Sequence, residues 1–244
     1  MTRQKIRKTL LLISFLFFPV TIYYLSPVLI IEGASKGIVV GSFIVFGTML
    51  ISSLILGRAF CGWLCPGGGI QESCLLIVDK KATGGKLNLI KYIIWVPWIL
   101  AIIIVSKMAG GFQSIDFFYQ INGGVSVADK QSYIIYYSFV ALIVILSLAA
   151  GRRAFCHYIC WMAPFMVIGA KIKTSLRLPS LNIRTKKQSC INCKSCERLC
   201  PMSLPVSTMV QEGAMSNSEC ILCGQCIDAC KSDVLRYSFG NRQR

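Results

Sequence analysis

The residues with the most distinctive chemistry in this sequence are eight cysteines between positions 190 and 230. They form two runs of one pattern, Cys-x2-Cys-x2-Cys-x3-Cys, and Pro201 follows the first run. A tight turn that carries three thiolates can surround one side of an iron–sulfur cubane, while the fourth thiolate comes from further along the chain. The two runs therefore predict two 4Fe-4S clusters.

This segment resembles the two-cluster bacterial ferredoxins, in which the fourth cysteine of each run ligates the other cluster. The resemblance implies that one cluster is held by Cys190, Cys193, Cys196 and Cys230. It implies that the second cluster is held by Cys220, Cys223, Cys226 and Cys200. One position departs from the pattern, since Lys231 follows Cys230 where a proline is usual. So short a segment buries little apolar surface, and we expect the clusters to act as its core.

Two other uses of clustered cysteines fit the sequence less well. Structural zinc sites contain paired Cys-x2-Cys motifs, but they do not repeat the x2-x2-x3 rhythm twice. A disulfide framework belongs to oxidising compartments, whereas the charge distribution described below predicts a reducing one. We therefore interpret the eight thiols as iron ligands.

The composition is that of a membrane protein. Of the 244 residues, 55% are hydrophobic and 15% are charged, and the mean hydropathy is +0.62. A soluble domain carries about 25% charged residues. Four apolar segments approach the length of about 20 residues that a helix needs to cross a bilayer. They cover approximately residues 10–31, 38–56, 89–105 and 133–150.

The formal net charge of +16 is distributed unevenly about these predicted spans. Of the 26 Lys and Arg residues, all but Lys36, Lys107 and Lys130 fall on the side that holds both termini. Basic residues mark the cytoplasmic side, so we expect a multi-pass protein of a prokaryotic cytoplasmic membrane, with both termini and the ferredoxin-like part in the cytoplasm. Orientation and contact with anionic lipid then explain the surplus charge, and nucleic acid is not an expected partner.

The hydrophobic part contains an internal repeat, because the second and fourth apolar segments each end in a Cys-x3-Cys pair. The four cysteines are Cys61, Cys65, Cys156 and Cys160. On a helix this spacing places both sulfurs of a pair on one face. If the two hairpins pack about a pseudo-twofold axis, the four thiols converge into a third redox site, which holds a further iron–sulfur cluster or a dithiol pair. The alternative is that these are simply buried cysteines.

Taken together, these features resemble the NapH/NosR-type membrane polyferredoxins, which combine four or more spans, two Cys-x3-Cys-Pro motifs and a dicluster ferredoxin. The stretch from Gly57 to Pro66 fits this pattern closely, whereas Trp161 replaces proline after Cys160. The resemblance implies oxidation of membrane quinol and delivery of electrons through iron–sulfur centres to other subunits of a respiratory redox complex.

Several charged residues near the motifs have candidate roles. His157, Glu72 and Asp116 are candidate proton acceptors for quinol, and Asp79 is a further inner-side carboxylate; an ordinary boundary charge is the alternative for each. His157 is the single histidine, so a haem held by two histidines is excluded within one chain. The motif arginines are candidates to stabilise negatively charged clusters, although membrane orientation also explains them. They are Arg58, Arg152 and Arg153.

The predicted fold is a mainly α membrane protein in three parts. Residues 1–172 form a transmembrane domain of four helices in two hairpins, residues 173–188 form a basic linker on the membrane surface, and residues 189–244 form a small α+β dicluster ferredoxin-like domain. The predicted function is electron transfer between membrane quinol and a redox partner, in either direction. The alternative is an accessory factor whose Cys-x3-Cys thiols reduce a metal or a dithiol during the maturation of another enzyme.

Overall fold

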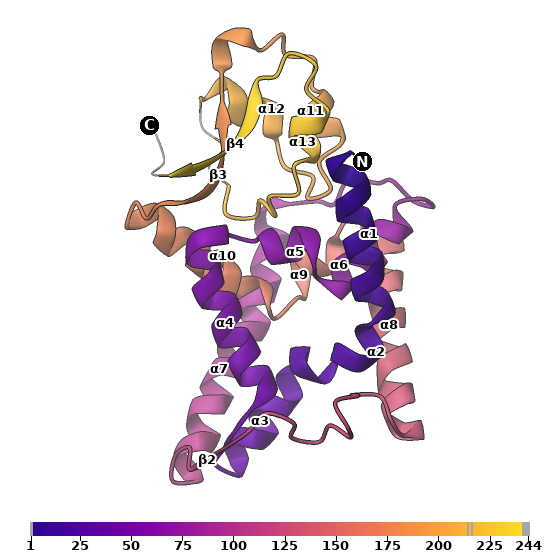
Figure 1. Cartoon of the computed structure of the whole chain (residues 1–244), viewed down its shortest axis with the longest axis vertical. Helices are drawn as coiled ribbons and strands as arrows, with labels where there is room; N and C mark the ends of the chain where they lie inside the picture. The colour runs from indigo at the N-terminus through magenta and orange to yellow at the C-terminus, as the bar shows by residue number, and fades with distance from the viewer. Residues whose placement is uncertain (1, 214, 216, 241–244) are drawn as a thin grey trace.

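The computed structural model describes residues 2–213, 215 and 217–240. Helices form an elongated bundle, and a small module of short helices with a two-stranded sheet lies at one end of it (Figure 1). The chain begins next to this module, because Arg3 forms an ion pair of 2.7 Å with Asp228. The mainly helical fold expected from the sequence is confirmed.

The first apolar segment is a series of short helices, in contrast to the single helix expected over 10–31. Its elements are α1 (Arg3–Leu16), α2 (Phe18–Thr21), the 3-10 turn η1 (Tyr23–Leu25) and α3 (Pro27–Ser35). Pro19 and Pro27 each stand in the first turn of a new helix. Proline has no N–H to donate and its ring clashes with the preceding turn, so a helix restarts at these positions. The breaks leave α3 at an angle to α1.

The internal repeat is present in the structure as two copies of the same order of helices. In each copy a long helix is followed by a short helix and then by a last helix. The first copy has α4 (Gly41–Leu56), α5 (Ala59–Trp63) and α6 (Pro66–Cys74); the second has α8 (Lys130–Ala150), α9 (Ala154–Tyr158) and α10 (Ala163–Ser175). The long helices end at Gly57 and Gly151, whose φ angles of 56° and 97° favour glycine. Each copy packs its last helix on the long helix of the other copy, α10 on α4 and α6 on α8.

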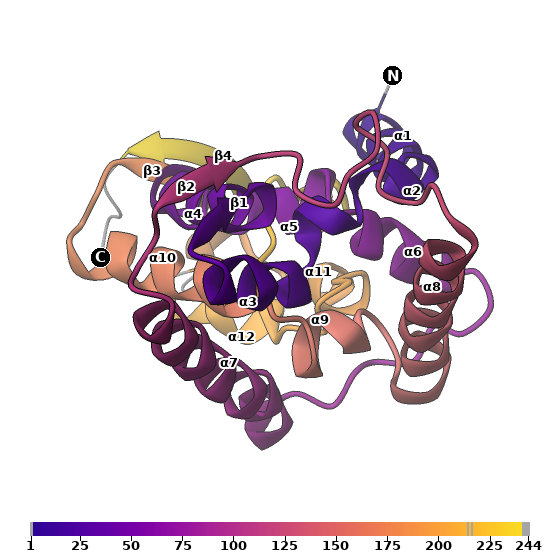
Figure 2. The same ribbon diagram turned by 90° about the horizontal axis from the view of Figure 1, so that it is seen from below.

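Among the described residues, two helices are long and apolar enough to cross a membrane. They are residues 85–108, which comprise η2 (Gly85–Leu89) and α7 (Ile90–Met108), and residues 130–150, which form α8. Both lie at the periphery of the bundle (Figure 2). Only 11% and 17% of their apolar windows are buried inside the protein, so the faces of these helices are available to lipid. They correspond to the third and fourth predicted spans, and α4 is a shorter apolar helix.

The C-terminal module is fastened to the bundle by a strand. β3 (Ser180–Thr185) follows α10 closely and pairs antiparallel with β4 (Leu235–Gly240), with Ser180 opposite Gly240. The segment 173–188, expected as a linker, therefore contains the end of α10 and one strand of this sheet. Between the strands lie η3 (Lys187–Ser189), α11 (Ser195–Arg198), α12 (Val206–Gln211) and α13 (Gln225–Asp228). At the far end of the bundle, β1 (Ile38–Val40) pairs in parallel with β2 (Ser114–Asp116).

The helix α5 packs directly against the backbone of this module. The indole Nε1 of Trp63 donates to the carbonyl oxygen of Leu222 at 3.0 Å. At the adjacent Gly62, a Cβ atom would lie 2.3 Å from the carbonyl oxygen of Ile221. A side chain at position 62 therefore cannot fit without separating α5 from the module.

We expect Gly62→Ala to weaken the docking of the module and to destabilise the protein by about 1–3 kcal/mol, the usual range for overpacking. Gly47→Ala in α4 is the control, because nothing lies within 4 Å of the added Cβ at that position. Thermal unfolding in detergent would measure both variants. Equal melting temperatures for the two would contradict the close approach at Gly62.

Candidate iron–sulfur site

The first group of four cysteines lines an exposed cavity of about 280 Å³. The four are Cys190, Cys193, Cys196 and Cys230. Cys193 is exposed and the other three are half-buried. Three members come from one run and the fourth comes from the end of the other, which is the grouping that the sequence predicted. We name this space the outer cavity.

The second group lines a smaller and more buried space of about 20 Å³, the inner cavity. Its cysteines are Cys200, Cys220, Cys223 and Cys226. Burial raises the pKa of the Cys200 thiol to about 11 and that of Cys220 to about 12. A buried thiolate needs a compensating positive charge, and bound iron would supply it with release of the thiol protons.

The backbone around both groups has the same turn conformation. Asn192 and Leu222, each two residues after the first cysteine of a run, have φ angles of 53° and 50°. Lys194 and Gly224, two residues further on, have φ angles of 57° and 74°. Left-handed residues alternating with ordinary ones turn backbone N–H groups toward a common concavity, the arrangement that receives iron–sulfur clusters and other anions. The backbone of both runs therefore fits a bound cluster.

A third group of thiols lies in the helical part, where the two Cys-x3-Cys motifs come together. We call it the paired-cysteine site; its members Cys61, Cys65, Cys156 and Cys160 are all buried. The thiols of the two motifs interact electrostatically with one another, and burial together with these neighbours raises the pKa of Cys65 to about 12. Gln71 also donates from Nε2 to the sulfur of Cys156 at 3.1 Å.

Two fully buried arginines flank the paired-cysteine site. Arg58 and Arg153 each precede the first cysteine of a motif by three residues and have no exposed surface. Within the described part of the chain, the Nε and Nη2 atoms of Arg58 and the Nε atom of Arg153 have no hydrogen-bond partner. Buried N–H donors without partners are costly, and a negatively charged cluster on the adjacent thiolates would satisfy them. The donor set and its surroundings thus fit an iron–sulfur cluster.

Two carboxylates neutralise these arginines. Glu72 pairs with Arg153 at 2.5 Å and with Arg7 at 2.6 Å. Burial opposes ionisation of Glu72, but Arg153 and Arg7 outweigh it and hold the pKa of Glu72 below its usual value. Glu219 pairs with Arg58 and, at 2.6 Å, with Lys91. Since Glu219 belongs to the C-terminal module and Arg58 to the helical part, this ion pair also connects the two.

The candidate proton acceptors lie in different places. His157 is buried between the helical part and the module, within 2.9 Å of Asn88 Oδ1 and 3.1 Å of the Met202 carbonyl oxygen. Burial and the nearby Arg58 lower the pKa of His157 to about 4. Glu72 is occupied by its two arginines. Asp116 lies exposed in β2, at the opposite end of the bundle from the module, and Asp79 pairs with Arg152.

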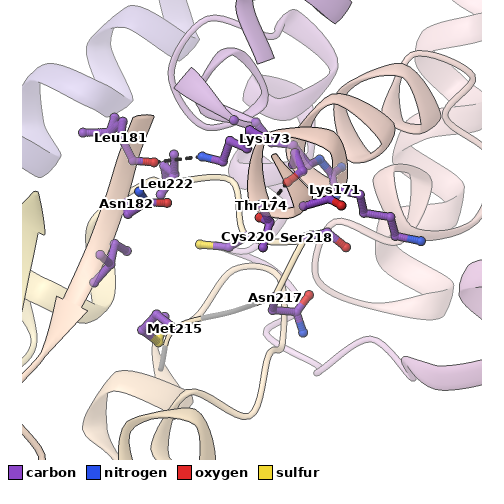
Figure 3. Close-up of a pocket in the computed structure, with 15 residues that line it drawn as sticks. Lys171, Lys173, Thr174, Leu181, Asn182, Met215, Asn217, Ser218, Cys220 and Leu222 are labelled. Carbon is purple, nitrogen blue, oxygen red and sulfur yellow. Dashed lines mark hydrogen bonds between the residues drawn. The ribbon is translucent and has the colours of Figure 1, made fainter. Parts of the chain in front are cut away.

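A cleft of about 400 Å³ lies where α10 meets the module (Figure 3). Cys220, Asn217 and Ser218 line its module side, and Lys171 lines its helical side. Lys173 crosses toward β3 and donates from Nζ to the carbonyl oxygen of Leu181 at 3.0 Å. The cleft therefore lies beside the cysteine-containing loop that starts at Cys220.

Single-ion metal sites are a separate question. Over residues 2–213, 215 and 217–240, no three His, Cys, Asp or Glu side chains are grouped closely enough to hold one metal ion. All thirteen cysteines, each of which is described, are free thiols in the structure.

Comparison with known families gives the class of the protein. A 4Fe-4S binding domain model matches twice, over residues 38–82 and 134–179, so the same model covers both copies of the repeat. A 4Fe-4S dicluster domain model matches residues 189–235. The chain is thus an iron–sulfur protein of the ferredoxin type. No solved structure matches it.

The chain is also similar to whole proteins over most of its length. The chain is 29% identical to protein MJ0750 of Methanocaldococcus jannaschii, over 99% of this chain and 97% of that protein. It is 24% identical to the putative electron transport protein YccM of Escherichia coli, over 86% of this chain and 59% of YccM. It is 23% identical to the ferredoxin-type protein NapH of Escherichia coli, over 90% of this chain and 78% of NapH. Together with the two family models, these similarities support a NapH-type polyferredoxin.

We expect Glu219→Gln to destabilise the protein by about 3 kcal/mol, because it leaves Arg58 and Lys91 buried without their counter-charge. Glu212→Gln in the same module is the control, since Glu212 is exposed. Thermal unfolding of the two purified variants provides the comparison. If Glu219→Gln melts together with the control, the ion pair contributes nothing to the contact between the module and the helical part.

Proposed function

We propose that this protein conducts electrons between membrane quinol and a redox partner through three 4Fe-4S clusters. The paired-cysteine site would hold the cluster nearest the membrane, the inner cavity the second, and the outer cavity the third. When bound, these clusters supply single-electron transfer. The ligands would be the three groups of four cysteines described above.

The observation that carries this proposal is the direct packing of the paired-cysteine site on the inner cavity. Gly62, which follows Cys61, touches the backbone of Ile221, which follows Cys220. On the other motif, His157, which follows Cys156, contacts the carbonyl of Met202 near Cys200. Both motifs therefore adjoin the loops of the inner cavity, and a carrier held by one site would lie next to a carrier held by the other.

The outer cavity supports the other end of the path. Cys193 is exposed, whereas the four cysteines of the paired-cysteine site are buried. A soluble or membrane-bound partner can approach a carrier at the outer cavity without any rearrangement of the helical part. The partner would be another subunit of a redox complex.

The proposed orientation places the module in the cytoplasm, with both termini on that side of a prokaryotic cytoplasmic membrane and several helices passing through it. The distribution of Lys and Arg supports this, since all but Lys36, Lys107 and Lys130 fall on the side of the termini. Lys36 lies near β1 at the end of the bundle opposite to the module.

The cluster count is tested by a double substitution, Cys61→Ser with Cys156→Ser. We expect iron and labile sulfide to fall from the content of three cubanes to that of two, because one thiolate of each motif is lost. Cys74→Ser is the control, since Cys74 is a buried cysteine outside all three groups. An unchanged iron content in the double variant would remove the third cluster from the proposal.

The link to quinol is tested on the protein reconstituted in liposomes. We expect a reduced quinol to bleach the cluster absorbance, with electrons reaching the module only when the paired-cysteine site is intact. Clusters that dithionite reduces and quinol does not would overturn the proposed function. In that case, loss of an assembled target enzyme on gene deletion would indicate a maturation role for the four thiols.

A further inference from the structure

An apolar cavity of about 230 Å³ lies directly against the paired-cysteine site. Three of the four thiols line it, namely those of Cys65, Cys156 and Cys160. Its walls come from α2, η1, α3, α6, α8 and α9. The polar side chains described in its wall, besides those thiols, are Tyr23 and Ser26, and no charged group lines it there.

The cavity lies on the other side of the thiols from the C-terminal module. The module touches the residue after the first cysteine of each motif, Gly62 and His157. The cavity touches the residue after the second cysteine of each motif, Pro66 and Trp161. A molecule in the cavity would therefore be separated from the module by the paired-cysteine site, in the order that electron transfer requires.

The cavity opens toward the outer surface of the helices. Val28 and Ile135 line it, and their side chains are 67% and 53% exposed. Ile135 belongs to α8, one of the two helices with the length and hydropathy of a membrane span. The mouth between these two residues would thus face lipid, and a lipid-soluble molecule could enter sideways without passing through water.

The aromatic lining suits a flat ring. Aromatic side chains form one wall, where the ring centroids of Phe139 and Trp161 lie 5.2 Å apart and those of Phe155 and Trp161 lie 5.8 Å apart. Ligand cavities commonly measure about 300–1,000 Å³, so this one has room for a ring and its substituents and not for a long tail. A tail would remain in the lipid beyond the mouth.

We propose that this cavity binds the head group of membrane quinol, between the aromatic wall and the thiols of Cys65, Cys156 and Cys160. This inference rests on the proposed function, and it identifies the apolar cavity as the binding site of the quinol that this function requires. Trp161 stands where the first motif has Pro66, so the indole that departs from the repeat is part of the ring-binding wall. Its Nε1 donates to the Leu25 carbonyl at 3.1 Å, which fixes its orientation.

Oxidation of quinol in the cavity needs one route for its electrons and another for its protons. Oxidation of the quinol breaks its two O–H bonds and gives the quinone, two protons and two electrons. An iron–sulfur centre that Cys65, Cys156 and Cys160 would help to hold could accept the two electrons one at a time, and the centres of the module would be the next acceptors. Tyr23 lines the cavity, and its hydroxyl is 2.7 Å from the hydroxyl of Ser132 in the first turn of α8. This pair offers the protons a route toward the end of the bundle remote from the module.

The test closes the mouth with a large side chain. In Ile135→Trp, the indole would block entry to the cavity, and Val28→Trp would do so from the opposite lip. Ile134→Trp is the matched control, because Ile134 is the adjacent residue of α8, is 68% exposed and is not among the residues that line the cavity. All three positions are on the outer surface, so the added ring need not disturb the core.

Two measurements are made on the holoprotein in liposomes. The first is mapping, by mass spectrometry, of the peptides labelled by a photoreactive short-tailed quinone. The second is the rate at which quinol reduces the clusters, with dithionite reduction as proof that they are intact. We expect labels on η1, α8 and α9 that excess unlabelled quinone removes. We expect a loss of labelling and a reduction at least tenfold slower in Ile135→Trp and Val28→Trp, with neither effect in Ile134→Trp.

The outcomes separate this inference from the proposed function. If quinol reduces the clusters equally fast in all variants and the label maps to another place, the cavity assignment is overturned while the proposed function stands. If the label enters the cavity but unlabelled quinone does not displace it, the cavity takes any apolar molecule, such as a lipid chain, and the assignment fails. If quinol never reduces the wild-type clusters, the proposed function itself fails.

Discussion

The arrangement of this molecule depends on positive charge buried beside thiols. Arg58 and Arg153 have no exposed surface, flank the paired-cysteine site and pair with Glu219 and Glu72. Guanidinium groups in an apolar environment are tolerated when they are paired. A cluster on four thiolates adds negative charge at the same place, so the arginines would stabilise both the carboxylates and the cluster. Because Glu219 belongs to the C-terminal module, the same interaction holds the module onto the helices.

The internal repeat gives this site two functionally distinct sides. Equivalent positions of the motifs face the same way, since Gly62 and His157 contact the module while Pro66 and Trp161 line the apolar cavity. The exchange of last helices, α10 onto α4 and α6 onto α8, brings the motifs together. A Cβ at Gly169 of α10 would lie 1.7 Å from the Ser53 hydroxyl of α4, which shows how close that crossing is. Neither copy forms the site alone.

The sequence predicted much of the chemistry and less of the geometry. The cysteine spacing anticipated two groups of four in the module, and the structure lines one cavity with each; iron ligation by them stays a prediction. Hydropathy alone overlooked the breaks at Pro19 and Pro27, because proline counts as a minor change in an apolar window while it ends a helix. The pairs Arg58–Glu219 and Arg7–Glu72 join residues remote in sequence, so no local pattern could reveal them. The apolar cavity is assembled from six helical elements that lie apart in the sequence, so no local pattern predicts it. In the sequence, only Trp161 drew attention to this place, because it departs from the repeated motif.

The pairing of β3 with β4 determines how the module can behave. Its first strand follows α10 after a short turn, and its last strand returns to lie beside that first strand, so both ends of the module are anchored at one place. An electron-transfer domain on a flexible linker moves between a donor and an acceptor. Here both ends of the module are anchored, so such movement is restricted. Electron transfer between successive carriers would then occur over a constant distance. A redox partner, whether a fixed subunit or a diffusing protein, would therefore have to be recognised by the module in the single position where the sheet holds it.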